Sequence, residues 1–323
     1  MLKRRQKTEI VRLFYAGDVH GSRLCWKKFV NAAAHYPADV LVMGGDLTGK
    51  ALVPIVREGD GSYSAKVIGE TRVARTAEEL DQMQRAISTN GMYPLIVDRD
   101  EARILANDSA RREEAFERAL LDELRLWVEL ADERLAGTGK RAYVIPGNDD
   151  PWSVDEVLEA GTSVVACDET VEIIGPHEMA SFGYSNRTPW QTPRELDEEE
   201  IYSRLKRLVD QFEKPGQAIL NVHVPPYESS LDTAFEVDEE LRYVMKGGRP
   251  HEVPTGSPAV RQIIEETQPL LSLHGHIHES KGVTKIGRTV AINPGSDYGS
   301  GHLDGCLVHL EAGRVINHYL VSG

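Results

Sequence analysis

The first fifty residues alternate between strand-like and helical patterns. Residues 10–17 (IVRLFYAG) are an apolar run typical of a strand, residues 22–36 have a helical pattern, and residues 38–45 (ADVLVMGG) are a second buried run. A strand–helix–strand unit of this kind joins two parallel strands by a right-handed crossover. The alternation therefore predicts an α/β fold.

The same alternation continues through most of the chain. A long helix is expected from near Ser109 to a C-cap at Gly137, and Ser153 and Glu156 match a capping box for a short helix. Three short strands between residues 163 and 184 look like a meander, and the chain from Lys281 onward is strand-rich. We also predict strands over 141–145, 217–223 and 269–276 and helices over 195–212 and 258–268.

Residues 51–106 interrupt this rhythm and are expected to form an inserted small α+β subdomain. They contain a hairpin pattern with GDG at its turn, a helix over 76–88 and a strand over 93–98. A long disordered loop is the alternative, but the regular alternation disfavours it. Because the insertion begins five residues after Asp46, we expect it to cap a nearby site or to form a dimer contact.

Composition restricts the partners of this chain. The 323 residues carry a formal charge of −14, which opposes binding to nucleic acid or an anionic membrane. No run approaches the ~18 apolar residues of a membrane span. The three cysteines (Cys25, Cys167 and Cys306) are scattered and form no CxxC, so reduced thiols and a cytoplasmic location are expected.

Residues 44–51 (GGDLTGKA) nearly match the phosphate-binding loop G-x-x-x-x-G-K-[ST]. Position 51 is Ala, so the hydroxyl that would hold magnesium is missing, and Pro54 follows where a helix would have to begin. We therefore reject a nucleoside triphosphatase and look for another role for these residues.

Five polar corners each follow a predicted strand: GDVHG (17–21), GGDLT (44–48), PGNDDP (146–151), NVHVPP (221–226) and HGHIHE (274–279). In open α/β sheets, ligands bind at the carboxyl ends of the strands. A lone Asp after a strand is usually a turn former, and a lone His is usually structural. All five corners together are better explained by a metal site with the candidate ligands Asp18, His20, Asp46, Asn148, His223, His276 and His278. His274 is out of register with His276 and is expected to support a ligand.

These residues resemble the calcineurin-like metallophosphoesterase superfamily, whose pattern is D-x-H, G-D, G-N-H-[DE], a lone His and G-H-x-H. The match runs from residue 10 to about 300 apart from the insertion, and one position departs from it, because Asp149 stands where the family has His. GYSNRTPW (183–190), VPPYESSLD (224–232) and INPGS (292–296) are similar to the bacterial and archaeal Icc-like branch.

The resemblance implies one metallophosphoesterase domain over residues 1–323, a four-layer αββα sandwich of two mixed sheets flanked by helices. It also implies two divalent metal ions bridged by Asp46. One would be held by Asp18, His20, Asp46 and His278, and the other by Asp46, Asn148, His223 and His276. Imidazole and carboxylate ligands suit manganese, iron, zinc, cobalt or nickel, and manganese is favoured.

The expected activity is phosphoester hydrolysis by a metal-bridging hydroxide, with Asn148 and His223 stabilising charge on the phosphoryl oxygens. Asp149 is a weaker general acid than His would be, so the sequence favours phosphodiesters with a good leaving group. A phosphomonoesterase and a non-catalytic scaffold of the same fold remain alternatives, while the acidic charge opposes a DNA nuclease.

Several other residues have two interpretations. Asp150 is expected either to cap the following helix or to support a ligand. Substrate contacts are expected from four residues in Gly/Pro-rich loops, which are Asn186, Arg187, Tyr227 and Tyr298. Within the insertion, the candidates are Tyr63, Arg72 and Tyr93. The expected partners are a small phosphoester and, through the insertion, a second copy of the chain.

Overall fold

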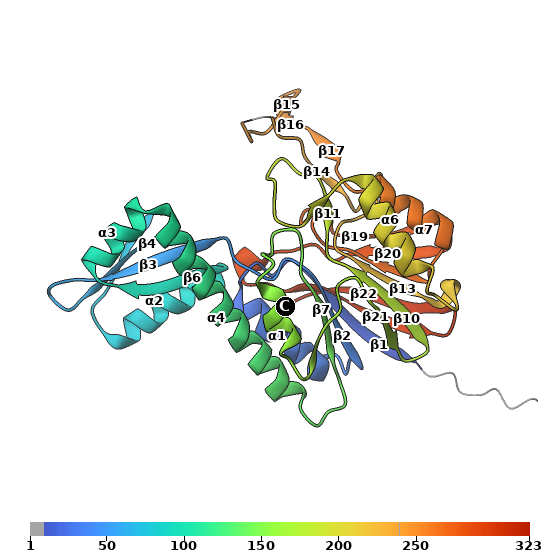
Figure 1. Cartoon of the computed structure of the whole chain (residues 1–323), viewed down its shortest axis with the longest axis horizontal. Helices are drawn as coiled ribbons and strands as arrows, with labels where there is room; N and C mark the ends of the chain where they lie inside the picture. Colours follow the sequence, from blue (N-terminus) through green and yellow to red (C-terminus); the bar gives the residue numbers. More distant parts are fainter. Residues whose placement is uncertain (1–9, 239) are drawn as a thin grey trace, which may run out of the picture.

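The computed structural model describes residues 10–238 and 240–323 and shows two stacked six-stranded sheets with helices on both outer faces (Figure 1). This is the predicted four-layer sandwich, and the prediction is confirmed. The first nine residues of the predicted 1–323 domain lie outside the described residues.

The first sheet carries the amino-terminal strand–helix–strand unit. Its order is β22 (Arg314–Ser322), β21 (Asp304–Glu311), β1 (Val11–Ala16), β2 (Val40–Gly44), β7 (Ala142–Ile145) and β8 (Val164–Ala166). The four strands from β1 to β8 are parallel, and β21 and β22 add to them in antiparallel fashion. The carboxyl ends of β1, β2 and β7 therefore meet at one edge.

The second sheet has a parallel centre and antiparallel edges. Its order is β19 (Gly282–Ile286), β20 (Thr289–Asn293), β18 (Leu271–Leu273), β13 (Ile219–Val222), β10 (His177–Phe182) and β9 (Val171–Ile174). The predicted meander over residues 163–184 is wrong, because β8 pairs with β7 in the first sheet and only β9 and β10 pair with each other. The chain crosses between the sheets after β8.

Three hydrophobic layers hold the sandwich together. Alternate side chains of the strands face opposite sides, so Leu13 and Val42 pack against Ile219 and Leu271 between the sheets. The outer face of the first sheet is covered by α1 (Arg23–His35), α4 (Ser109–Leu135) and α5 (Val154–Glu159). The outer face of the second is covered by α6 (Glu198–Val209) and α7 (Pro258–Thr267).

Residues 51–107 form the inserted α+β unit, a lobe beside the sandwich in Figure 1. Its four-stranded sheet has the order β5 (Glu70–Ala74), β4 (Tyr63–Val67), β3 (Ala51–Arg57) and β6 (Met92–Val97). Helix α2 (Ala77–Thr89) begins at a capping box of Thr76 and Glu79. Helix α3 (Arg99–Asn107) was not predicted. A small core of its own, which includes Ile55, Met83 and Ile87, makes the unit compact.

Helix α4 joins the insertion to the sandwich. It contacts β3, β6 and α3 near its start and α1 further on, where the rings of Trp26 and Trp127 stack 5.1 Å apart. The Trp26 indole N–H also donates to the Trp127 carbonyl at 2.9 Å. The helix ends with the C-cap Ala136, and Gly137 follows with a φ of 70°, which is the left-handed conformation expected there.

The remaining elements of the described chain are short. β11 (Ser185–Asn186) pairs with β12 (Glu195–Leu196). A projecting arm, residues 233–238 and 240–254, contains β14 (Thr233–Phe235), β15 (Met245–Lys246), β16 (Arg249–Pro250) and β17 (Glu252–Pro254) (Figure 1). The 3-10 turns are Pro215–Gln217 and Tyr298–Ser300. No helix in the described part of the chain is long and apolar enough to span a membrane.

Candidate metal centre

The five polar corners meet at one place. They follow β1, β2 and β7 in the first sheet and β13 and β18 in the second, so stacking the sheets brings the ends of these strands together. Three clusters of possible metal ligands result, each with ligand atoms within 4.8 Å of one another, and the third of them is His20, Asp46 and Asp149. The first comprises Asp18, His20 and His278, and the second comprises Asp46, His223 and His276.

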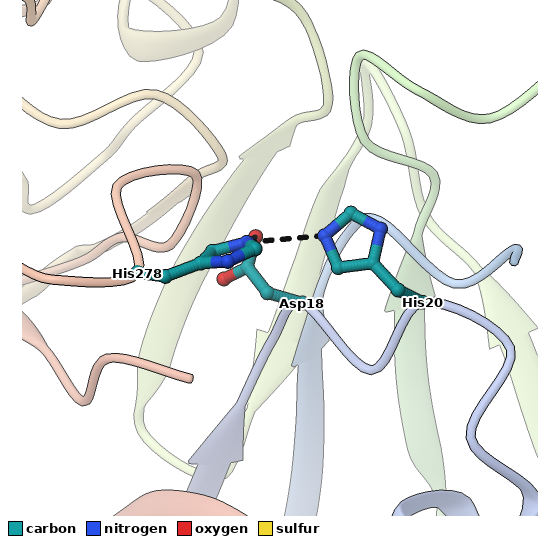
Figure 2. A group of neighbouring side chains, drawn as sticks. All are labelled: Asp18, His20 and His278. Atoms are coloured by element: carbon teal, nitrogen blue, oxygen red, sulfur yellow. Dashed lines mark hydrogen bonds and ion pairs between the residues drawn. The ribbon is translucent and has the colours of Figure 1, made fainter. Parts of the chain in front are cut away.

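Figure 2 shows the first cluster, in which Asp18 and His20 from the corner after β1 face His278 from the loop after β18. The Nε2 atoms of His20 and His278 lie 3.0 Å apart, and His278 Nε2 is 3.5 Å from Asp18 Oδ1. The Asp46 carboxylate extends towards this cluster, with its Oδ2 3.5 Å from His20 Nε2.

Asp46 also belongs to the second cluster. Its other oxygen, Oδ1, lies 3.5 Å from His223 Nε2, so one carboxylate faces both groups of ligands. His223 Nε2 is also 2.9 Å from Asn148 Oδ1. A single residue with one oxygen towards each cluster is suited to hold two cations close together.

Several electron-rich atoms of the site face one another. His223 Nδ1 lies 2.7 Å from the Gly44 carbonyl, and donating its N–H to that oxygen turns the lone pair of Nε2 towards the oxygens of Asp46 and Asn148. A proton or a metal cation must separate these electron-rich atoms. Burial alone would lower the pKa of His223, but the Asp46 carboxylate raises it to about 10. In the absence of a metal, the site thus draws in a proton.

Two other imidazoles are in the form that binds metal. Desolvation lowers the pKa of His20 and of His276 to about 4, so both rings are neutral near pH 7 and have a lone pair to offer. His20 Nδ1 is also a buried polar atom without a hydrogen-bond partner. The residues present therefore fit a pair of divalent cations.

The backbone at the ligands is strained. Asp18, His20, Asp46 and His276 have φ values of 54°, 37°, 52° and 66°, a left-handed region that non-glycine residues rarely occupy. Such strain persists only where the surrounding structure enforces it, and it concentrates at functional sites. Here the left-handed backbone conformation directs the side chains of these four residues away from the strand axis and towards the site.

Neighbouring glycines let the ligand loops approach one another. A Cβ on Gly147 would lie 2.2 Å from Asp46 Oδ1, and one on Gly275 would lie 2.4 Å from Asp18 Oδ2. Both distances are shorter than any contact that a real Cβ makes, so a side chain at either position would displace a ligand carboxylate.

The amide of Asn148 is oriented by a network. Its Nδ2 donates to the Thr192 hydroxyl at 2.9 Å, which turns Oδ1 towards His223 and the site. The buried Glu195 accepts from the Thr192 hydroxyl at 2.7 Å and from the backbone N–H groups of Thr188 and Thr192. This network turns the amide oxygen, the atom through which an amide would bind a metal, towards the first two clusters.

Asp150 supports the ligand loops and does not cap a helix. It is fully buried and accepts from the backbone N–H groups of Leu47, Thr48 and Gly147 at 2.8–3.0 Å. The predicted capping box of Ser153 and Glu156 is also wrong, because Ser153 is in the helical conformation and makes no capping hydrogen bond. Asp150 instead ties the loop that carries Asp46 to the loop that carries Asn148.

Arg194 was missed by the sequence analysis. Its side chain is 1% exposed and donates to the carbonyls of Asp150 and Pro151 at 2.9 and 3.1 Å and to Asp155 at 2.7 Å. Its guanidinium also lies 4.4 Å from the centre of the Trp152 ring. The residue holds the PGNDDP corner, yet nothing local in the sequence distinguishes it from a surface arginine.

His274 lies behind the ligands, as predicted. Its Nδ1 is 2.9 Å from the Val222 carbonyl and 3.1 Å from the Val224 carbonyl, on either side of His223. Its Nε2 is 2.7 Å from the Ser272 hydroxyl. Asn293 likewise holds the 274–279 loop by donating to the carbonyls of Gly275 and Ile277. These two residues position ligands without facing the site.

Asp149 faces the centre and has a partner that the sequence analysis did not anticipate. Its Oδ2 lies 2.5 Å from Lys50 Nζ and 3.7 Å from His20 Nδ1, and its backbone N–H donates to Asp46 Oδ1. Burial and the Asp46 carboxylate raise the pKa of Asp149, and Lys50 opposes that shift. Ala51 begins strand β3 and not a helix, in agreement with rejection of the phosphate-binding loop.

The metal centre opens into a cavity of about 520 Å³, and two of the four predicted substrate contacts line it. These are Asn186 and Arg187. Tyr298 is not part of the lining, but its ring lies 4.7 Å from that of His20. Tyr227 is not part of the lining either, and its backbone N–H donates to the Ser257 carbonyl beside α7.

The insertion supports the site from behind. Tyr93 is buried, and its hydroxyl accepts from the Gly49 N–H at 2.7 Å, which fixes the loop between Asp46 and Lys50. Tyr63 and Arg72 lie on the insertion's own sheet. No residue from 51–106 lines the cavity, so the predicted cap and dimer contact both stay predictions.

Comparisons with known proteins show the fold. No family model matches the chain. An uncharacterized protein of Methanocaldococcus jannaschii, MJ1162, is 32% identical over 152 residues, which is 46% of this chain and 62% of that protein. The chain thus matches less than two thirds of that relative's length.

Two solved structures align along nearly their whole length. One has a TM-score of 0.56 at 17% identity, and TT1561 of Thermus thermophilus has a TM-score of 0.52 at 15% identity; each covers 98% of this chain and 99% of the other. Phosphoesterases are among the more distant matches, such as Yfce from E. coli at 11% identity and a TM-score of 0.32, with 96% of this chain and 98% of that chain covered. At these identities, the two structures with TM-scores above 0.5 show the fold alone.

Proposed function

We propose that this chain is a metal-dependent phosphoester hydrolase with two divalent ions. The observation that carries the proposal is the position of Asp46, whose two oxygens face two separate groups of ligands at 3.5 Å. When bound, such ions would supply Lewis acidity to a phosphoryl group and would lower the pKa of a water molecule. Manganese is the favoured metal, because the ligands are imidazole, carboxylate and amide without thiolate.

The side chains have separate roles in this proposal. Asp18, His20 and His278 would hold one ion, and Asn148, His223 and His276 would hold the other, with Asp46 shared between them. Asn148 lines the cavity, where it would stabilise charge on the phosphoryl oxygens, whereas His223 is fully buried and would act on that charge from outside the lining. A local cationic centre allows an anionic substrate to bind to a chain with a net charge of −14.

The proposed substrate is a small phosphodiester with a good leaving group. Asp149 stands at the position where the superfamily pattern has His, and its carboxylate is engaged by Lys50 at 2.5 Å. A carboxylate in an ion pair is a poor proton donor, so the reaction depends on a leaving group that departs readily. Phosphomonoesterase activity on the same site is the alternative.

The test is hydrolysis by the purified, manganese-loaded chain. We expect bis(4-nitrophenyl) phosphate to be cleaved with a higher kcat/KM than 4-nitrophenyl phosphate. Asp46→Asn should reduce kcat/KM by about 1,000-fold or more, and Asp149→Ala by much less, because only the former disrupts both ions. A higher rate on the monoester would reverse the substrate ranking.

A non-catalytic scaffold of this fold is distinguished by metal content. A scaffold has no need of stoichiometric metal, whereas the proposed enzyme should contain about two divalent ions per chain. Absence of both metal and hydrolysis of either substrate would contradict the proposed function.

A further inference from the structure

The cavity beside the metal centre has a second, apolar wall that phosphoryl binding does not use. The 520 Å³ cavity lies within the range of about 300–1,000 Å³ typical of pockets for small organic ligands. His20, Asp46 and Asn148 line one side of it. The other side is formed by Trp190, Phe235, Val237, Tyr243 and Val253, which we call the apolar wall.

The wall comes from two segments that are each held by hydrogen bonds. Trp190 lies in the loop that Glu195 fixes through its hydrogen bonds with Thr188 and Thr192. The backbone N–H of Trp190 also donates to the Thr188 hydroxyl at 3.2 Å. The same network orients the ligand Asn148. The loop thus holds the aromatic ring and a metal ligand in one arrangement.

The projecting arm supplies the other side of the wall. Its backbone is paired, with the Val244 N–H donating to the Glu236 carbonyl and the Glu236 N–H donating to the His251 carbonyl, both at 2.8 Å. The rings of Phe235 and Tyr243 meet edge to face, with centroids 5.4 Å apart. The arm therefore presents a preformed aromatic surface.

These aromatic residues are unusually exposed. Trp190 and Tyr243 are each 61% exposed, although both line a cavity that also contains the candidate ligands. Large apolar side chains that are exposed together in a concave site commonly contact a ligand.

Two charged residues of the cavity lining, Arg187 and Glu236, are already paired. Arg187 donates to Asp197 at 2.8 Å, and Glu236 lies 2.6 Å from His251. Arg187 is therefore not a free cation that could hold a second phosphate, and Glu236 is a carboxylate that would repel one. The chemistry of this end of the cavity therefore suits a neutral apolar group and not a polyphosphate chain.

We propose that the apolar wall binds the organic group of the substrate, which makes the substrate class a single phosphoryl group esterified to an aromatic or bulky apolar moiety. This inference rests on the proposed function, because the phosphoryl group must lie at the metal centre for its ester group to reach the wall. Trp190 and Tyr243 are the specificity-determining residues in this arrangement.

The test uses two unreactive probes with the same phosphonate group. Phenylphosphonate and methylphosphonate are titrated into the manganese-loaded full chain by calorimetry and as inhibitors of bis(4-nitrophenyl) phosphate hydrolysis. We expect phenylphosphonate to bind about 10- to 100-fold more tightly, the discrimination typical of an apolar pocket. Trp190→Ala and Tyr243→Ala should each reduce that ratio several-fold, and the double variant should bring it close to one.

Tyr319→Ala is the matched control, since Tyr319 is a half-exposed aromatic residue on β22 outside the cavity, and it should leave the ratio unchanged. Equal affinities for the two phosphonates in the unmodified chain would overturn the inference alone. An unchanged ratio of the two affinities in the Trp190→Ala/Tyr243→Ala double variant would overturn it as well. Failure to bind either phosphonate, in a chain that still hydrolyses bis(4-nitrophenyl) phosphate, would also overturn the inference alone. Absence of both bound metal and hydrolysis would overturn the proposed function and the inference with it.

Discussion

Lys50 Nζ lies 2.5 Å from Asp149 Oδ2 at the mouth of the metal centre. Burial alone would lower the pKa of Lys50, but the Asp149 carboxylate raises it above its usual value. The residues are 99 positions apart, and they meet because the loops after β2 and β7 are neighbours. In the superfamily pattern that this chain resembles, His stands at position 149, so an ion pair here replaces an imidazole.

We predict that Lys50 stabilises the leaving oxygen of the substrate. Lys50→Ala should then lower kcat/KM about tenfold more for diphenyl phosphate than for bis(4-nitrophenyl) phosphate, because charge on the poorer leaving group needs more stabilisation. A plot of log kcat/KM against leaving-group pKa should become steeper, while Lys50→Arg retains part of the effect.

Lys206→Ala is the control for Lys50, since Lys206 forms a lysine–aspartate pair with Asp210 on the surface of α6. It should leave the slope of the plot unchanged. An equal loss of rate for both esters in Lys50→Ala would assign Lys50 a purely structural role.

Removal of the metals should destabilise the chain. Asp18 and Asp46 are buried carboxylates close together, and without cations their repulsion opposes folding. Treatment with a chelator should lower Tm, and manganese at about 1,000 times its Kd should restore about 4 kcal/mol of stability. Differential scanning calorimetry measures the shift.

His223→Gln should abolish most of this metal-dependent shift, because it removes a ligand that faces Asp46 at 3.5 Å. His318→Gln changes an exposed histidine on β22 and should behave as the unmodified chain does. A chelator effect of the same size in all three proteins would argue against metal binding at this centre.

Arg194→Met should reduce the free energy of unfolding by about 2–4 kcal/mol, because it leaves the carbonyls of Asp150 and Pro151 without their donor. Arg194→Lys should lose a similar amount of stability, because the lysine ammonium lacks the planar fork of donors of a guanidinium group. Urea denaturation measures the change. Arg118→Met, at an exposed position on α4, should change stability by less than about 0.5 kcal/mol. Similar losses in the two variants would refute the role of Arg194.

Asp168 should make stability depend on pH. Burial raises its pKa from 3.8 to about 6, so between these values the folded chain holds a proton that the unfolded chain releases. Its contribution is therefore favourable below pH 3.8 and is lost as pH rises through about 6. In Asp168→Asn, the free energy of unfolding should decrease less steeply between pH 3.8 and about pH 6 than in the unmodified chain.

The measurement for Asp168 uses urea denaturation of the metal-free chain, so that release of metal at low pH does not contribute. Asp100→Asn serves as the control, because Asp100 is 85% exposed on α3. If the difference between Asp168→Asn and the unmodified chain is constant across this range, Asp168 does not titrate as described.

Local chemistry made the fold class predictable from the sequence, together with the residues that gather at the edge of the sheets. Hydrophobic runs separated by helical patterns indicate an α/β fold, whereas the four-layer sandwich was expected only from the family resemblance. Polar corners at strand ends indicate where candidate ligands gather. Asp18 and His20 could be identified as candidate ligands from the local sequence, because both directly follow a predicted strand. The Gly residues beside them permit the close approach that such corners require.

Tertiary structure alone decided how the corners are held and what the cavity accepts. Asp150 binds the N–H group of Leu47, which is 103 positions away, and Arg194 binds the carbonyl of Asp150 from 44 positions away. Trp190 and Tyr243 line one cavity although they belong to separate segments. Such contacts follow from the stacking of two sheets, and no local periodicity encodes them. The sequence by itself determined which residues could hold metal, whereas the packing of the loops determined the partner of Asp149 and the apolar wall.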